Sequence, residues 1–327
     1  MADPFDGRDF ISLMDYTGEE LGIILDLASD LKAMQRRGES HEFLRGKILG
    51  MMFGKPSTRT RVSFETGITQ LGGHGQFYTT DSLQTAHKES WDDTGRVLDR
   101  YIDGLVARLY DLGGYDVARN ALRAMGENAQ MPIINALDDK EHPCQVMADI
   151  MTMKEKFGNT IGERKIVLTW GYSKRNRPAG VPQAMVAATS LLGLNLTIAY
   201  PEGYELDPVY VDFARRANEL SGGSLEIVHD VYDAASGADV IYVKNWGSRT
   251  IPLEEDLASR GKYADDWCLS EKHYARASRR AYFMHPLPAE RNQEVTDEVI
   301  DGPRSIVYDE AENRLHAQKA IMTLLMR

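Results

Sequence analysis

Residues 53–61 carry the sequence FGKPSTRTR, which lies between an apolar run at 48–53 and a helical pattern at 63–71. The apolar run has the length and composition of a buried strand, and the pair Gly72-Gly73 is typical of a helix stop. Lys55 to Ser57 form the turn between strand and helix. The stretch therefore predicts a strand that leads directly into a helix, which is the elementary unit of a parallel α/β sheet.

The same stretch has the side chains of an anion site. A helix start presents free backbone N–H groups and the positive end of the helix dipole to a ligand. The hydroxyls of Ser57, Thr58 and Thr60 can donate hydrogen bonds there, and the Arg59 guanidinium can bind phosphate oxygens with two donors. Serine and threonine are also ordinary helix caps, but two arginines among three hydroxyl residues exceed what a cap needs. Phosphate binding is the favoured interpretation.

Strand and helix patterns alternate through the rest of the chain, which predicts an α/β protein with two Rossmann-like domains, each built on a central parallel sheet. The expected strands are residues 48–53, 104–109, 132–136, 165–169, 195–200, 226–229 and 239–243, and the clearest helices are 21–34, 63–71, 143–157, 181–192, 209–220 and 309–325. We expect residues 1–148 to form the first domain, with a C-terminal helix at 309–327 packing back on it, and residues 149–308 to form the second domain.

Composition narrows the class of protein. The 327 residues are 43% hydrophobic and 27% charged, near the soluble globular average, and the net charge of −11 argues against general affinity for nucleic acid or an anionic membrane. The first ten residues are unlike a secretory signal, and two cysteines are too few for a disulfide framework, so a cytoplasmic protein is expected. Scattered histidines without ligand spacing predict no metal site, and no cofactor is expected.

Several residues at strand ends and helix starts have two interpretations. Arg108 lies at the end of a predicted strand, where parallel sheets bind ligands, although a solvated surface arginine is the alternative. His142 alone would more often be structural. Cys144 fits a buried helix-start cysteine better than a nucleophile, because no base partner is evident. Asp149 fits a solvated helix face.

The stretch STRTR at 57–61 resembles the phosphate-binding signature of the aspartate and ornithine carbamoyltransferase family. Four further motifs of this chain resemble motifs of the same family, in the same order. They are HKES at 87–90, HPCQ at 142–145, HPLP at 285–288 and ENRLH at 312–316. They extend from Phe53 to the C-terminus, and their ordered combination is far more specific than any one of them. The resemblance implies transfer of a carbamoyl group from carbamoyl phosphate to the amine of a small amino-acid-like acceptor. It also implies that residues 1–148 form a carbamoyl phosphate-binding domain and residues 149–308 an acceptor-binding domain.

The resemblance also implies roles for individual residues. Phosphate would be held by Ser57, Thr58, Arg59 and Thr60, with Arg314 adding charge; Thr60, Arg108 and His142 would polarise the carbonyl oxygen; Gln145 and the backbone carbonyls of His285, Pro286 and Leu287 would take the amino hydrogens. Lys88 or His87 would close the site from a neighbouring subunit. That arrangement implies a homotrimer with shared active sites.

The acceptor half departs from ordinary ornithine enzymes. Their serine-methionine-glycine loop is missing, and KNWG at 244–247 stands in its place, which resembles the knotted branch that includes acetylornithine and succinylornithine carbamoyltransferases; a knotted loop is therefore possible in the second domain. Candidate acceptor-binding residues are Lys244, Asn245, Trp246, Lys174, Arg177 and Glu290. Trp246 is equally a core aromatic or an acceptor wall. Glu290 stands where acylornithine members carry arginine, and it could prefer a cationic acceptor or pair with Arg291.

The likeliest acceptor is an N-acylornithine, ornithine or a related diamino compound. One alternative is a nucleotide-binding Rossmann oxidoreductase, but no G-x-G-x-x-G turn follows the strand at 165–169. Another is a non-catalytic relative that binds a metabolite. The intact set Arg59, Arg108, His142, Gln145 and Arg314 argues against it.

Overall fold

The chain forms two compact units in a computed structural model that describes residues 3–80 and 89–327. One unit comprises Met1–Met151 with Glu312–Arg327, and the other comprises Thr152–Ala311. Both boundaries fall inside helices, namely α5 (Pro143–Phe157) and α12 (Val307–Met326). The boundaries predicted at 148 and 308 lie in the same two helices.

The first unit contains a four-stranded parallel sheet, as far as the described residues show, with the order β2-β1-β3-β4. Its strands are β1 (Ile48–Phe53), β2 (His74–Thr79), β3 (Gly104–Arg108) and β4 (Ile133–Leu137). Its helices, besides the parts of α5 and α12, are a short 3-10 turn (Leu13–Asp15), α1 (Gly18–Arg36), α2 (Thr58–Gln70), α3 (Trp91–Leu98) and α4 (Val117–Glu127). The chain steps outward from β1 to β2 and then back across to β3, so the carboxyl ends of β1 and β3 form a topological switch point.

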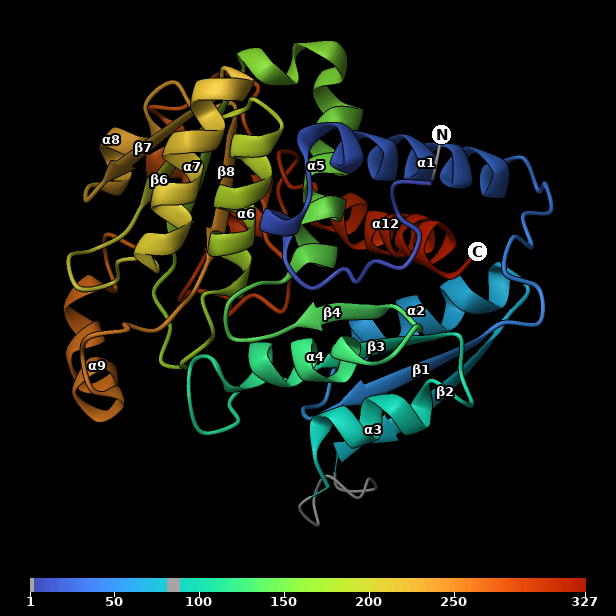
Figure 1. The fold of residues 1–327 in the computed structure, drawn as a ribbon. Helices are drawn as coiled ribbons and strands as arrows, with labels where there is room; N and C mark the ends of the chain where they lie inside the picture. The colour runs from blue at the N-terminus through green and yellow to red at the C-terminus, as the bar shows by residue number, and fades with distance from the viewer. Residues whose placement is uncertain (1–2, 81–88) are drawn as a thin grey trace. The chain divides into compact units, whose positions relative to one another are not determined.

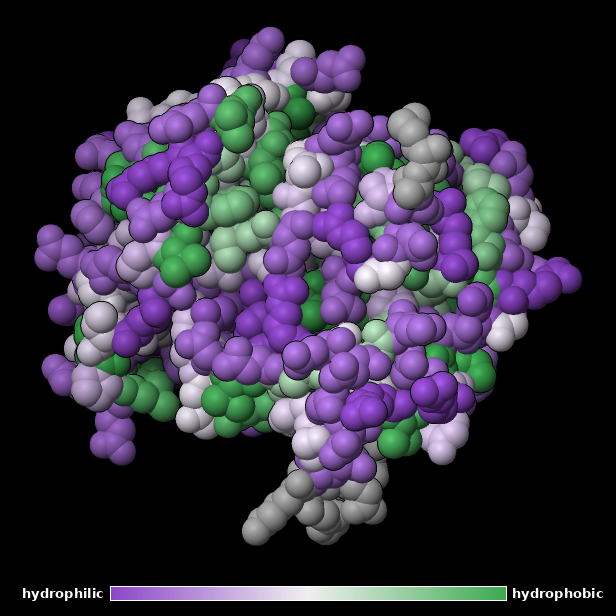
Figure 2. Space-filling view, viewed as in Figure 1, coloured by the Kyte–Doolittle hydropathy of each residue, from purple (hydrophilic) through white to green (hydrophobic). Residues whose placement is uncertain are grey.

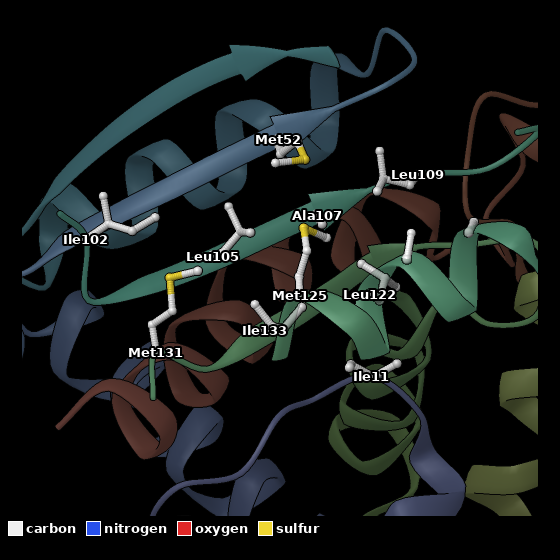
Figure 3. Packing of buried hydrophobic residues seen from close by; sticks show 12 residues of the cluster. Ile11, Met52, Ile102, Leu105, Ala107, Leu109, Leu122, Met125, Met131 and Ile133 are labelled. Atoms are coloured by element: carbon white, nitrogen blue, oxygen red, sulfur yellow. The ribbon is translucent and has the colours of Figure 1, made fainter. Parts of the chain in front are cut away.

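Helices cover both faces of this sheet (Figure 1). A side chain added at Gly95 of α3 would collide with the Met125 backbone of α4, so α3 and α4 pack closely together. Gly67 of α2 similarly faces Lys319 and Met322 of α12. Figure 3 shows the apolar core, where Leu105 of β3 and Ile133 of β4 meet side chains of α4.

The second unit contains a parallel sheet of order β7-β6-β5-β8-β9. Its strands are β5 (Lys165–Trp170), β6 (Asn195–Ala199), β7 (Ser224–Val228), β8 (Val240–Lys244) and β9 (Tyr282–Met284). Its helices are 3-10 segments at Gly158–Glu163 and Arg260–Tyr263, with α6 (Gly180–Leu191), α7 (Pro208–Ser221), α8 (Val231–Ala235), α9 (Leu253–Ser259), α10 (Glu271–Tyr274) and α11 (Asp297–Ile300). The switch point lies between β5 and β8.

The predicted α/β fold with two parallel sheets is confirmed. Two strands were not predicted: β2 lies at the sheet edge with residues that are only partly buried, and β9 is three residues long, so neither has a strong apolar pattern. Helix α2 begins at Thr58, five residues before the predicted start at 63. The knotted loop remains a prediction.

The surface in Figure 2 is predominantly hydrophilic, with hydrophobic residues in scattered groups. Among helices of the described residues, none combines the length and the apolar character needed to cross a bilayer.

Candidate functional site

The first turn of α2 presents the hydroxyl residues of the predicted anion site. Ser57 occupies the N-cap position with an extended φ of −156°, but its side chain makes no capping hydrogen bond within the described structure. The Ser57 hydroxyl therefore accepts no hydrogen bond from a helix N–H, whereas the hydroxyl of an ordinary cap does. Ser57, Thr58 and Lys55 line a pocket of about 700 Å³. Free N–H groups of the helix start and these hydroxyls together suit an anion.

The exits of three neighbouring strands are joined to one another. The Gly54 N–H donates to Arg108 O across 3.0 Å, and the Leu109 N–H donates to Leu137 O across 3.0 Å. Arg108 is the last residue of β3, as expected, and the buried His142 directly precedes α5. The sheet therefore fixes the segments that carry Arg108, His142 and the α2 start relative to one another.

Arg314 joins two of these segments from α12. Its Nη1 donates to Gln145 Oε1 (2.7 Å) and its Nη2 donates to Thr60 Oγ1 (2.9 Å). The guanidinium is 3% exposed, and its Nε has no hydrogen-bond partner among the described residues. Burial, and then the positive charges of Arg108 and Arg59, lower the pKa of Arg314 to about 10. Positive charge from three arginines thus converges beside Thr60 and Gln145.

Gln145 is oriented from its other side by Asp149. Its Nε2 donates to Asp149 Oδ1 across 2.7 Å, which turns its Oε1 toward Arg314. The interpretation of Asp149 as part of a solvated helix face was wrong, because Asp149 is fully buried. The α5 pattern hid this role because an isolated acid on a helix usually faces water.

Cys144 is a structural residue, as predicted. It is fully buried, its Sγ lies 3.4 Å from Asn135 O, and burial raises the pKa of the thiol to about 12. A thiol held in its protonated form is a poor nucleophile.

The second unit gathers the residues of the HPLP motif around Glu294. The Asn245 N–H (3.0 Å) and the Glu290 N–H (2.8 Å) donate to its carboxylate, and His285 Nε2 lies 3.3 Å from its Oε1. Burial raises the pKa of Glu294, but the charges and hydrogen bonds of His285, Lys244 and the backbone outweigh it and lower the pKa to about 2. Glu294 is therefore a fixed negative charge.

The HPLP backbone itself has an unusual conformation. Leu287 has a φ of 47°, which is rare for a branched residue, and its N–H donates to His285 Nδ1 across 2.9 Å. The buried Pro286 lies between them. A constrained backbone of this kind fixes the direction of the carbonyl groups.

Lys244 ends β8 beside this carboxylate. Burial lowers the pKa of Lys244 to about 8, although the Glu294 charge opposes the shift, and its Nζ donates to Asn245 O across 2.6 Å. Asn245 is buried, and its Nδ2 donates to Gly171 O. Trp246 is 0% exposed and donates from Nε1 to Tyr204 O (2.9 Å), which favours the core-aromatic interpretation.

Lys174, Arg177 and Glu290 line a separate pocket of about 460 Å³ together with Arg175. The Glu290 carboxylate accepts from Ser173 Oγ (2.7 Å) and pairs with Arg175 Nε (2.7 Å). Of the two alternatives for Glu290, pairing with Arg291 is not found: Arg291 binds Asp297 on α11 and Asp301 just after it. Glu290 is the one acid among the residues that line this pocket, and Arg175 neutralises it. The net charge that Lys174 and Arg177 give the pocket is therefore positive.

Sequence reasoning missed Glu294, and the one signal that could have drawn attention to it is its position shortly after the HPLP motif. Lys88 and His87 lie outside the described residues. Within residues 3–80 and 89–327, no cluster of three His, Cys, Asp or Glu side chains is arranged to hold a metal ion.

The two parallel sheets, with Arg108 and Lys244 at the carboxyl ends of central strands, define a two-unit α/β protein. Residues 8–155 match the family description "Aspartate/ornithine carbamoyltransferase, carbamoyl-P binding domain", and residues 168–325 match "Aspartate/ornithine carbamoyltransferase, Asp/Orn binding domain". The chain belongs to the aspartate/ornithine carbamoyltransferase family, and it is a transferase.

Several known proteins are similar to this chain along almost its whole length. The ornithine carbamoyltransferase of Thermococcus kodakarensis is 42% identical over 98% of this chain and 96% of its own length. The solved ornithine carbamoyltransferase of Pyrococcus furiosus is 41% identical, with a TM-score of 0.89 over 98% of both chains. A solved acetylornithine transcarbamylase with acetylcitrulline is 33% identical, with a TM-score of 0.89 over 98% of this chain and 99% of that one. The oxidoreductase alternative is not favoured.

Proposed function

We propose that the first unit binds carbamoyl phosphate at the start of α2. Ser57, Thr58, Arg59 and Thr60 would bind the phosphate through hydroxyl, guanidinium and backbone N–H groups, and Arg314 would add charge from behind. The supporting observation is that the Arg314 guanidinium bonds to both Thr60 and Gln145 while its charge is felt by Arg59 and Arg108. Three cations near one buried point are mutually repulsive, so a doubly charged ligand there would relieve the repulsion.

The chemistry follows from where charge develops. An amine of the acceptor attacks the carbonyl carbon and negative charge grows on the carbonyl oxygen. The bond to phosphate then breaks, and the proton that the amine loses passes to the leaving phosphate. Thr60, Arg108 and His142 would stabilise the oxygen, and Gln145 would orient the amino group. Preorganised donors of this kind lower the barrier by electrostatics and positioning. Nothing in this scheme calls for a cofactor.

The acceptor would bind to the second unit. The relatives named above are ornithine and acetylornithine enzymes, which supports a diamino acid such as ornithine or an N-acylornithine. Lys244, Lys174 and Arg177 would bind its carboxylate, with Asn245 and Trp246 forming the strand-end segment behind them. Glu290, clamped by Ser173 and Arg175, would shape the rim of the pocket.

The direct test is incubation with carbamoyl phosphate and L-ornithine or N-acetyl-L-ornithine, scored by the colour reaction of the ureido product and by released phosphate. Turnover with one acceptor supports the proposal. Saturable binding of carbamoyl phosphate without turnover of any acceptor would instead indicate a non-catalytic metabolite-binding relative.

We also propose a cytoplasmic homotrimer with active sites shared between subunits. Lys88 would reach the site of a neighbouring subunit, and the free thiols Cys144 and Cys268 suit a reducing compartment. A mixture of Lys88→Ala and Arg59→Ala chains should regain activity, because some mixed sites would contain both intact residues. No recovery after subunit exchange would contradict the shared site.

A further inference from the structure

A second network lies under the loop that carries Lys174, Arg175 and Arg177. The loop follows β5, and the side chains of Lys174 and Arg175 are exposed. Arg260, at the end of α9, lies beneath it and is 1% exposed. A fully buried guanidinium needs a hydrogen-bond acceptor for each N–H donor. The acceptors of Arg260 therefore show which segments it joins.

Arg260 uses all five of its N–H donors. Nε and Nη2 donate to the two oxygens of Asp256 (2.8 and 2.6 Å), and Asp256 is itself 1% exposed. Nη1 donates to the carbonyls of Ser173 (3.2 Å) and Arg175 (2.8 Å), and Nη2 also reaches Asn176 Oδ1 (3.4 Å). Three of its five hydrogen bonds therefore end on residues 173–176 of the loop.

The carboxylate end of the pair is equally constrained. Tyr204 Oη (2.6 Å) and the Ser248 N–H (3.2 Å) also donate to Asp256. The Arg260 guanidinium packs 5.8 Å from the Trp170 ring and 5.6 Å from the Tyr204 ring. Arg260 thus anchors the backbone of the loop to an aromatic core from below, while Glu290 binds Ser173 and Arg175 and the Gly247 N–H donates to Arg177 O (3.0 Å).

We infer that Arg260 is a positioning residue for acceptor specificity, which fixes the loop that presents Lys174 and Arg177 to the acceptor. The inference rests on the proposed function of that pocket. Lysine cannot replace Arg260, because a single ammonium has three donors at one point and cannot reach Asp256 and two separate carbonyls together. The loop would then sample positions in which Lys174 and Arg177 no longer converge.

The test compares Arg260→Lys with the wild-type protein by acceptor kinetics, carbamoyl phosphate calorimetry and hydrogen exchange of the peptide containing residues 173–177. We expect the KM for the acceptor, L-ornithine or N-acetyl-L-ornithine, to rise about tenfold from the lost loop hydrogen bonds. The donor Kd should stay within about twofold because the donor residues of the first unit keep their contacts. The loop amides should exchange faster. Arg304→Lys is the matched control, since Arg304 pairs with Glu271 in the same unit.

Asn176→Ala provides a second variant if Arg260→Lys folds poorly. It removes one loop contact and leaves the buried Arg260–Asp256 pair intact, so a smaller effect of the same sign is expected. A lower Tm with unchanged acceptor KM and unchanged loop exchange would overturn the inference, because it would reduce Arg260 to a stabilising residue. If the wild-type protein turns over neither acceptor, the proposed acceptor fails, and unchanged loop exchange in the variants would then overturn the positioning role by itself.

Discussion

Arg314 Nη2 donates to Thr60 Oγ1 across 2.9 Å, and the two residues are 254 positions apart in the chain. The bond lies within the first unit and connects α12 to the first turn of α2. Its partner bond to Gln145 brings α5 into the same contact. One guanidinium therefore links the three helices that carry Thr60, Gln145 and Arg314 itself.

Thr60→Val should strongly impair turnover. Valine keeps the shape but removes the acceptor of Arg314 Nη2, and an unsatisfied buried charged donor costs about 1–3 kcal/mol. We expect kcat/KM for carbamoyl phosphate to fall at least tenfold, measured by phosphate release. Thr60→Ser retains the hydroxyl and is the control. Equal activity of the two variants would show that the hydroxyl has no role.

Asp149→Asn should disturb Gln145. The carboxylate now fixes the Gln145 amide by accepting from Nε2, whereas an asparagine can also donate and so permits the flipped amide. A flipped Gln145 would point its NH2 group at Arg314. We expect kcat to fall about tenfold, with a smaller effect on the donor Kd. Wild-type kcat in Asp149→Asn would contradict this orienting role.

Lys244 should make acceptor binding depend on pH. Its pKa is lowered to about 8, so its positive charge is present below that pH and is lost as pH rises above it. Binding of L-norvaline, which keeps the carboxylate but lacks the δ-amine, should weaken from pH 7 to pH 9 in calorimetric titrations. Lys244→Gln should bind more weakly at pH 7 and lose this dependence. If the affinity for L-norvaline fell equally with pH in both proteins, Lys244 would not be a ligand of the acceptor carboxylate.

Asp139 should influence stability against pH. Burial, and then the neighbouring Asp138 and Asp111 charges, raise its pKa to about 6, although its Oδ1 accepts from the Asp111 N–H. A folded-state pKa above the unfolded value means that stability falls as pH rises from about 4 to about 6. Asp139→Asn should therefore have a higher Tm than wild type at pH 8 and an equal Tm at pH 4. A lower Tm of Asp139→Asn than of the wild-type protein at pH 8 would contradict the predicted direction of the pH dependence.

The motifs predicted the proposed donor-binding residues from sequence, but the hydrogen-bond partners of those residues depend on the fold. Ser57, Arg108 and His142 lie at strand exits and helix starts, positions that alternating patterns predict well. Local patterns contain no information on the pairing of Arg314 with Thr60 or of Gln145 with Asp149, because each bond depends on how buried helices face one another. Asp149, Glu294 and Arg260 are buried charges, and composition alone assigns such residues to the surface.

Calorimetric titration with carbamoyl phosphate tests the central proposal, that the arginines and hydroxyls of the first unit bind this anion. The wild-type protein should show saturable binding with one site per chain, and Arg59→Ala, which alters a partly exposed side chain, should keep its Tm and lose most of that binding. No saturable heat in the wild-type protein, or undiminished binding in Arg59→Ala, would contradict it.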